Sequence, residues 1–75
     1  MAEVKREYYS SGELYSEVFE INGRKNGEYK EYHLMGQLIE IGLYIDDKKI
    51  GEHKKYHQNG QLLEISSYID GKIQG

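Results

Sequence analysis

Three histidines, His33, His53 and His57, are the side chains best suited to bind a metal ion or to transfer protons. His53 and His57 are four residues apart, about 13 Å along an extended strand. His33 and His57 are 24 residues apart, at equivalent positions of a repeat, where two strands would separate them by about 10 Å. A shared metal needs both ring nitrogens about 2 Å from one ion. The spacing therefore predicts no metal site, and three histidines exposed on a polar sheet face.

Carboxylates are the next candidates, because paired acids can act as a general acid and a general base. Glu31 and Glu40 are predicted to face each other across one hairpin. Such a pair needs a desolvated cleft that separates the two pKa values, and an open sheet face has none. Asp46-Asp47 is typical of a turn rather than of a calcium loop, which needs several spaced oxygen ligands. We expect no catalytic residue and no enzymatic activity.

A lysine cluster suggests an anionic surface as a ligand. Its members are Lys48, Lys49, Lys54 and Lys55. Basic segments gain about 1 kcal/mol per charge near anionic lipid, but acidic residues interleave with these lysines and the net charge is −3. The pattern favours a solvated edge that discourages strand pairing. The acidic balance also argues against nucleic-acid binding.

These side chains are positioned by a repeat of 24 residues without insertions, in units 4–27, 28–51 and 52–75. We treat residues 1–75 as one domain. The residues that define the repeat are Tyr8, Gly12, Leu14, Tyr32, Gly36, Leu38, Tyr44, Tyr56, Gly60, Leu62, Tyr68 and Gly71. Tyr8, Tyr32 and Tyr56 are expected to stack as a ladder at this spacing.

Each unit contains two turn signals and one alternating strand. The first signal (Asn59-Gly60 in the last unit) predicts a two-residue hairpin turn that pairs Tyr32 with Ile39 and Tyr56 with Leu63. The second signal is Asn22-Gly23 and its equivalents, and we expect the Asp46-Asp47 version to be looser because Asp47 lacks the freedom of glycine. The fold class is therefore all-β: three tandem hairpins in a single twisted antiparallel meander of about six strands.

The chain of 75 residues is near the lower size limit for a single core, and it contains no cysteine. Without disulfides or thiolate metal sites, a reducing compartment is the default, so we expect a cytoplasmic protein. No cofactor is predicted.

The units resemble the MORN motif in its bacterial repeat-variant form. The residues that carry the resemblance are Gly51, Tyr56, Asn59, Gly60, Leu62, Tyr68, Gly71, Lys72 and Gly75, with Gly27, Tyr32, Gly36, Leu38, Tyr44 and Lys48 in the preceding unit. Met35 and Asp47 depart from the motif, as do Ser11 and Glu20 in the first unit. The resemblance implies elongated sheets of hairpins that act as scaffolds and often dimerise. It also implies phospholipid contact for some members and an antitoxin label for many bacterial ones.

We therefore expect a non-catalytic module for protein–protein interaction or scaffolding, antitoxin-like in its narrower form, with a peripheral phospholipid-binding module as the alternative. Alternation predicts one apolar face and one polar face, and a single sheet cannot cover its own apolar face. The candidate interface residues are Ile39, Ile41, Leu43, Ile45, Leu63, Ile65 and Ile69. Tyrosines near the turns, such as Tyr32 and Tyr56, are expected on the same face. Covering this face by a second chain predicts a homodimer.

Overall fold

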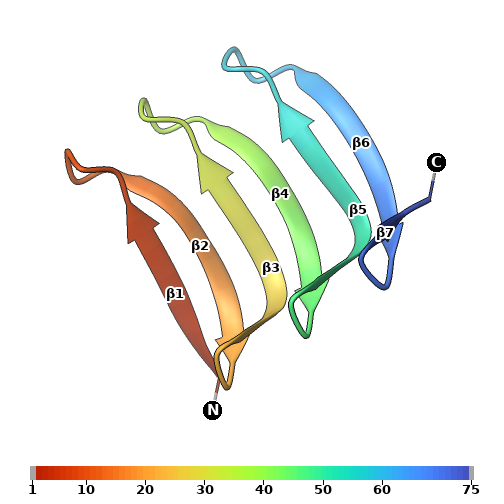
Figure 1. Cartoon of the computed structure of the whole chain (residues 1–75). Coiled ribbons are helices and arrows are strands. Elements are labelled where there is room, and N and C mark those ends of the chain that lie inside the picture. The colour runs from red at the N-terminus through yellow and green to blue at the C-terminus, as the bar shows by residue number, and fades with distance from the viewer. Residues whose placement is uncertain (1, 75) are drawn as a thin grey trace.

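The computed structural model describes residues 2–74 and places them in one antiparallel sheet whose strands follow one another in sequence order (Figure 1). Within these residues the strands are β1 (Ala2–Tyr8), β2 (Leu14–Ile21), β3 (Arg24–Tyr32), β4 (Leu38–Ile45), β5 (Lys48–Tyr56), β6 (Leu62–Ile69) and β7 (Lys72–Ile73). The all-β meander of tandem hairpins is confirmed. None of the described residues forms a helix of the length and hydrophobicity that crossing a bilayer requires.

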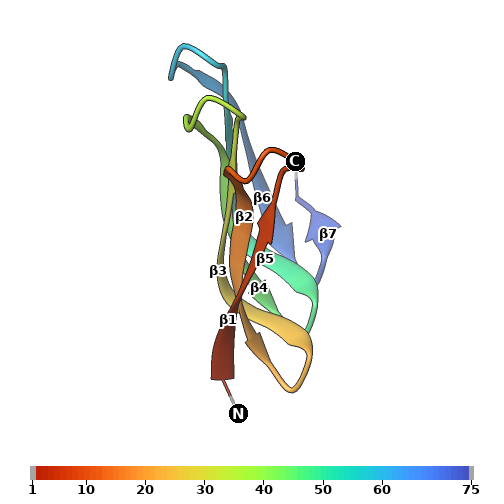
Figure 2. The same cartoon turned by 90° about the vertical axis from the view of Figure 1, so that its left-hand side faces the viewer.

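The sheet is a single layer, and its extents are 33, 32 and 13 Å. Seen from the side, the strands bend near the end that carries the two-residue turns, so that this end curls to one side (Figure 2). The bend does not bring a second layer over either face. The core therefore consists of side chains that pack against their neighbours along one surface.

The two-residue turns lie at Asn22-Gly23, Asp46-Asp47 and Asp70-Gly71. Both residues of each turn have a positive φ, which is the requirement of a type I′ hairpin. The expectation that the Asp46-Asp47 turn is looser is wrong. Two residues separate Ile45 from Lys48, as in the other two turns, and both have a positive φ. The Asp47 carboxylate accepts a hydrogen bond from the Lys25 amide at 2.7 Å, which offsets the steric cost of its φ of 67°.

The same turns connect successive hairpins. The Asp47 amide donates to the Lys25 carbonyl at 3.0 Å, and 24 residues later the Gly71 amide donates to the Lys49 carbonyl at 2.9 Å. Each hairpin is thus hydrogen-bonded to the next at the turn as well as along the strands.

The turns at the other end are longer than predicted. In the turn at residues 33–37 the His33 amide donates to the Gln37 carbonyl, and the Gly36 amide donates to the His33 carbonyl, both at 2.7 Å. Gly36 has a φ of 95°, whereas Met35 is not among the residues with positive φ. This geometry is a type I turn followed by a left-handed glycine, which inserts a bulge.

The bulge changes the register that was predicted from a two-residue turn. Tyr32 pairs with Leu38 instead of Ile39, and Tyr56 pairs with Leu62 instead of Leu63. Ile39 and Leu63 are left without a cross-strand partner, because the register shifts at these points, between Glu31 and Tyr32 and between Lys55 and Tyr56.

The two faces of the sheet differ from the expectation of one apolar and one polar face. The first, which we call the aromatic face, carries Val18, Tyr29, Tyr44, His53 and Tyr68. The best-buried apolar side chain, Val18, lies there at 5% exposure. The opposite face, which we call the isoleucine face, carries Ile41, Leu43 and Ile45 of β4 and Ile65 and Ile69 of β6, and all of these except Ile41 are exposed. The face predicted to be polar is therefore the better packed.

Candidate functional site

A row of rings crosses the aromatic face from β3 to β6. Tyr29 and Tyr44 meet edge to face at a centroid distance of 5.8 Å, Tyr44 and His53 at 5.6 Å, and His53 and Tyr68 at 5.0 Å. Such contacts add to the burial energy of aromatic side chains. The expectation that Tyr8, Tyr32 and Tyr56 stack as a ladder is wrong. Among the described residues, the ring contacts join Tyr29, Tyr44, His53 and Tyr68 in one row and Tyr9 with Tyr15 in a separate pair.

His53 is the centre of this row and the least exposed of the residues highlighted above, at 3%. Its Nε2 atom lies 2.9 Å from the Leu43 carbonyl oxygen and 3.3 Å from the Leu43 amide nitrogen. Its buried Nδ1 atom has no hydrogen-bond partner within the described part of the chain. A proton on Nε2, donated to the carbonyl, leaves only an acceptor unpaired, which costs less than a buried N–H without a partner.

Gly42 makes room for the His53 ring. A Cβ atom at Gly42 would lie 2.1 Å from Nδ1 and 2.2 Å from Cε1 of this ring. The expectation that all three histidines are exposed is therefore wrong for His53, which is a packed core residue. His33 and His57 lie in the turns instead of the strands. No group of three potential metal ligands occurs among residues 2–74.

Carboxylates form a second row on the aromatic face, as predicted. Glu31 lies opposite Glu40, Glu40 opposite Lys55, and Lys55 opposite Glu64. Burial raises the pKa of the Tyr29 phenol, and the hydrogen bond that it donates to Glu31 at 2.7 Å raises this pKa further.

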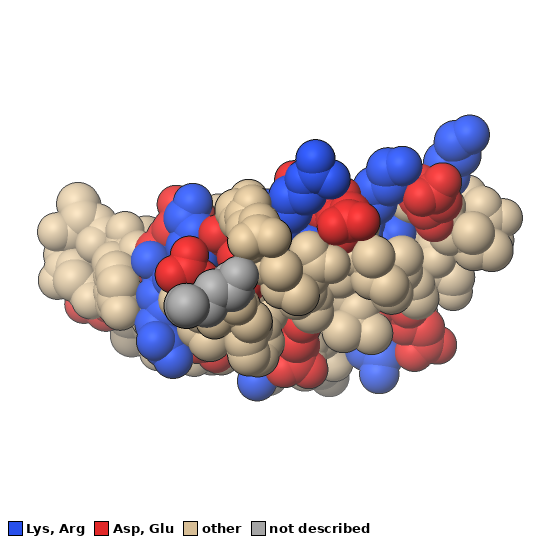
Figure 3. Space-filling view, turned by 90° about the horizontal axis from the view of Figure 1, so that it is seen from below, with Lys and Arg blue, Asp and Glu red and all other residues tan. Residues whose placement is uncertain are grey.

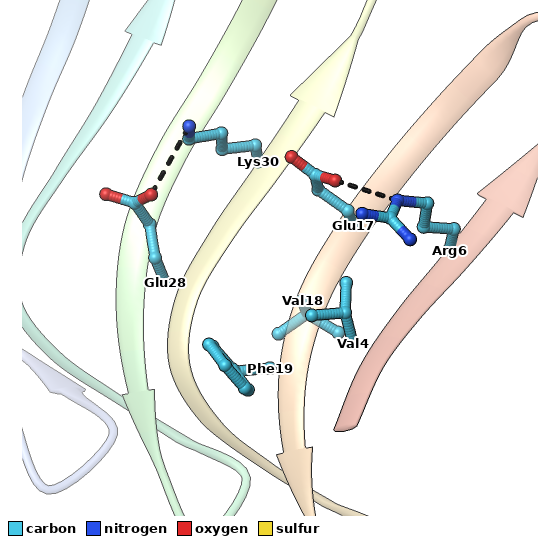
Figure 4. A pocket seen from close by; sticks show the side chains of 7 residues that line it. All are labelled: Val4, Arg6, Glu17, Val18, Phe19, Glu28 and Lys30. Atoms are coloured by element: carbon cyan, nitrogen blue, oxygen red, sulfur yellow. Dashed lines mark hydrogen bonds and ion pairs between the residues drawn. The ribbon is translucent and has the colours of Figure 1, made fainter. Parts of the chain in front are cut away.

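The isoleucine face contains two shallow depressions that are equivalent by the 24-residue repeat. The first, drawn in Figure 4, is lined by Val4, Arg6, Glu17, Val18, Phe19, Glu28 and Lys30. The second is lined by Glu28, Ile41, Gly42, Leu43, Glu52 and Lys54. Four of these are the repeat equivalents of residues in the first depression: Ile41 of Glu17, Leu43 of Phe19, Glu52 of Glu28 and Lys54 of Lys30. The replacement of Glu17 by Ile41 makes the second depression the more apolar.

Charges on this face form two parallel rows across the strands. The acid row consists of Glu28 and Glu52, and the base row of Lys30 and Lys54 lies two residues further along β3 and β5. Lys30 pairs with Glu28 at 3.4 Å (Figure 4). Seen from the end of the sheet that lies at the bottom of Figure 1, acidic and basic groups of the molecule lie side by side and form no large patch of one sign (Figure 3).

Aliphatic side chains between and beside these rows remain accessible. The exposed fraction is 43% for Leu43, 53% for Ile45, 48% for Ile65 and 65% for Ile69. Ile41 and Ile39 are half-buried, and Leu63 is exposed at 55%. The predicted interface residues other than Ile39 and Leu63 thus share one face of β4 and β6.

The lysine cluster does not form one basic patch. Strand alternation on β5 places Lys48 and Lys54 on the isoleucine face and Lys49 and Lys55 on the aromatic face. Lys48 pairs with Asp70 at 3.4 Å, and the Lys49 ammonium lies 5.0 Å from the ring centroid of Tyr68. Lys48 and Lys49 thus have separate partners within the chain.

The repeat-defining residues form the turns, the strand ends and part of the row of rings. Gly12, Gly36 and Gly60 are the left-handed glycines of the longer turns, and Gly71 belongs to a two-residue turn. The strand-end tyrosines lie opposite the strand-start leucines, in the pairs Tyr8–Leu14, Tyr32–Leu38 and Tyr56–Leu62. Tyr44 and Tyr68 belong to the row of rings.

Sequence reasoning missed Tyr29, Gly42 and His53 as a packed group. The available signal was the repeat itself, which aligns His53 with Tyr29 and so with an aromatic position.

The family model described as "MORN repeat variant" matches the chain twice, at residues 25–46 and 49–70. The first match covers the hairpin of β3 and β4, and the second covers the hairpin of β5 and β6. The two matches together span more than half of the chain. Comparisons with curated proteins and with solved structures give no match.

Proposed function

This chain belongs to the MORN repeat variant family, and we propose that it is a non-catalytic module for protein–protein interaction or scaffolding. The isoleucine face is its binding surface. The observation that carries the proposal is the exposure of Leu43, Ile45, Ile65 and Ile69, at 43–65%, on one face of a single-layer sheet. Contiguous exposed apolar side chains rimmed by charges are typical of binding sites.

Physical chemistry favours a protein as the ligand of this face. Full burial of an aliphatic side chain is worth about 1.5–3 kcal/mol, so covering four side chains that are about half exposed offers several kcal/mol. The charges of the two rows give such a contact its orientation. The phospholipid alternative lacks comparable support, because the lysines of β5 point to opposite faces and lie among acidic residues.

The test uses a photo-crosslinking amino acid, p-benzoylphenylalanine, at Ile65 on the isoleucine face. The matched control carries it at the neighbouring Glu64 on the aromatic face. We expect protein adducts from position 65, identified by mass spectrometry, and few from position 64. Adducts with lipid alone, or equal protein adducts from both positions, would contradict the proposal.

A narrower version of this function is toxin neutralisation, in which the face covers the active surface of a toxic protein. It predicts that the product of an adjacent reading frame arrests growth and that co-expression of this chain relieves the arrest. The Leu43→Glu variant should fail to relieve it while remaining folded. Relief by this variant equal to that by the wild type would contradict the use of this face.

A further inference from the structure

On β3 and β5 the isoleucine face has a charge arrangement that is complementary to itself. On β2 the base row continues with Glu17, which Arg6 neutralises at 3.1 Å within the chain. The acid row and the base row run parallel across the strands, about 7 Å apart, the distance of two residues along a strand. A twofold axis that runs across the strands, midway between the rows, places each acid row over the base row of a second copy. Along this axis every strand keeps its own position, so the repeat spacing matches without adjustment.

We infer that the partner of the isoleucine face is a second copy of this chain, packed face to face about that axis. The inference rests on the proposed function, since it assigns the occupant of the same surface. In this arrangement Glu28 faces the second copy's Lys30, and Glu52 faces its Lys54. Between these charge pairs, on β4, Leu43 faces Ile41 of the second copy. An interface of this kind is isologous, so each contact occurs twice.

The area fits a stable dimer. The two longer extents of the sheet, 33 and 32 Å, give a face of about 1,000 Å². Two twisted sheets pack with their strands within about 30° of each other, so contact is closest at the centre, on β4. Contact over half to all of the face buries between about 1,000 and 2,000 Å² in total, which spans the standard range for specific interfaces.

The surface of the single chain also indicates a missing contact. Its accessible area is 5218 Å², whereas a compact monomer of its mass of 8.8 kDa exposes about 4,800 Å². The charges arrive at the contact partly neutralised, because Glu28 and Lys30 already lie 3.4 Å apart within one chain. This lowers the desolvation cost of bringing the rows together.

The experiment is sedimentation equilibrium of the purified chain over the micromolar range, with charge-changing variants. We expect the wild type to show twice the mass of one chain. Lys54→Glu places like charges opposite each other twice per dimer and should raise the dissociation constant about tenfold or more. The double variant Glu52→Lys/Lys54→Glu exchanges the rows, restores complementarity about the same axis and should return the dissociation constant to near the wild-type value.

Two control variants, Lys5→Glu and Val4→Glu, separate loss of this contact from a general effect of added negative charge. Lys5→Glu makes the same charge change on the aromatic face and should leave the dimer intact. Leu43→Glu should abolish it, while Val4→Glu, at the same 43% exposure but on the peripheral strand β1, should retain it.

Three results would overturn the inference: a monomeric wild type, a dimer indifferent to Lys54→Glu, or a double variant as weak as the single one. If Leu43→Glu does not fold, the charge exchange still decides. A monomer whose position 65 crosslinks to another protein leaves the proposed function standing and removes only the second copy as its partner.

Discussion

Replacing Gly42 with alanine should destabilise the chain, although the same change at an ordinary strand position would stabilise it. Gly42 is not among the glycines with positive φ, so alanine suits its backbone and removes conformational freedom from the unfolded chain. The added Cβ atom, however, would lie 2.1 Å from the His53 ring, far inside van der Waals contact. The sign of the effect therefore depends on whether the ring can move.

The ring is held from three sides. Its Nε2 atom contacts the Leu43 backbone, and the rings of Tyr44 and Tyr68 pack against it at 5.6 and 5.0 Å. Displacement forfeits one hydrogen bond, worth about 0.5–1.5 kcal/mol, and two ring contacts of about 0.5–1.5 kcal/mol each. The gain from replacing glycine is about 0.5–1 kcal/mol. We expect a net loss of about 0.5–4 kcal/mol, centred near 2 kcal/mol, and the central value corresponds to roughly 8–16 °C in Tm for a domain of this size.

A double-mutant cycle with His53→Ala tests this reasoning by chemical or thermal denaturation. In the His53→Ala background the clash is absent, so Gly42→Ala should be neutral or stabilising by about 0.5 kcal/mol. The expected coupling energy between the two positions is thus about 2 kcal/mol or more. An equal cost of Gly42→Ala in both backgrounds would refute the proposed contact, because the loss would then come from the strand itself.

Three further predictions concern the turns and the buried phenol. Asp47→Ala loses the hydrogen bond to the Lys25 amide and keeps an unfavourable φ, so it should lower the free energy of unfolding by about 1.5–2.5 kcal/mol, whereas Asp47→Gly should cost less than half as much. Equal losses in urea denaturation would contradict this account. Gly36→Ala meets no atom within 4 Å, so its cost should be conformational only, about 1–2 kcal/mol, and Gly36→Asn should cost less. Because the pKa of Tyr29 is raised above 10.0, its stabilising contribution is fully present below pH 10 and is lost as pH rises further; Tyr29→Phe should make unfolding less steeply dependent on alkaline pH, and an unchanged dependence would exclude this phenol as its source.

Much of the fold could be predicted because the repeat leaves few alternatives. Period-two alternation along β4 and β6, with turn residues at a fixed spacing, is compatible only with antiparallel hairpins in sequence order. The predicted pairing of Glu31 with Glu40 was correct, because the register shift between Glu31 and Tyr32 leaves Ile39 unpaired and so restores the register expected of a two-residue turn. The aliphatic candidates Ile41, Leu43, Ile45, Ile65 and Ile69 do share one face.

The errors have two physical origins. A glycine after residues such as Met35 is compatible with either a two-residue turn or a longer one, and only the φ of the preceding residue decides. The better-packed face was misassigned because hydrophobicity identifies aliphatic residues, whereas Tyr44, His53 and Tyr68 bury their area through ring contacts. A histidine packed over Gly42 leaves no signature in a single alternation pattern.

The strict sequence order of the strands has a consequence for how the molecule opens. Each hairpin is bonded only to the one before it and the one after it, along the strands and through the Asp47 and Gly71 amides at the turns. Such a chain behaves as a one-dimensional array, in which stability is the sum of local terms and nearest-neighbour couplings. Amide hydrogen exchange should be slowest on β4, beside His53, and should quicken step by step toward both outer strands. Loss or gain of one whole unit of 24 residues would then change the number of couplings by one and leave the remaining hairpins as they are.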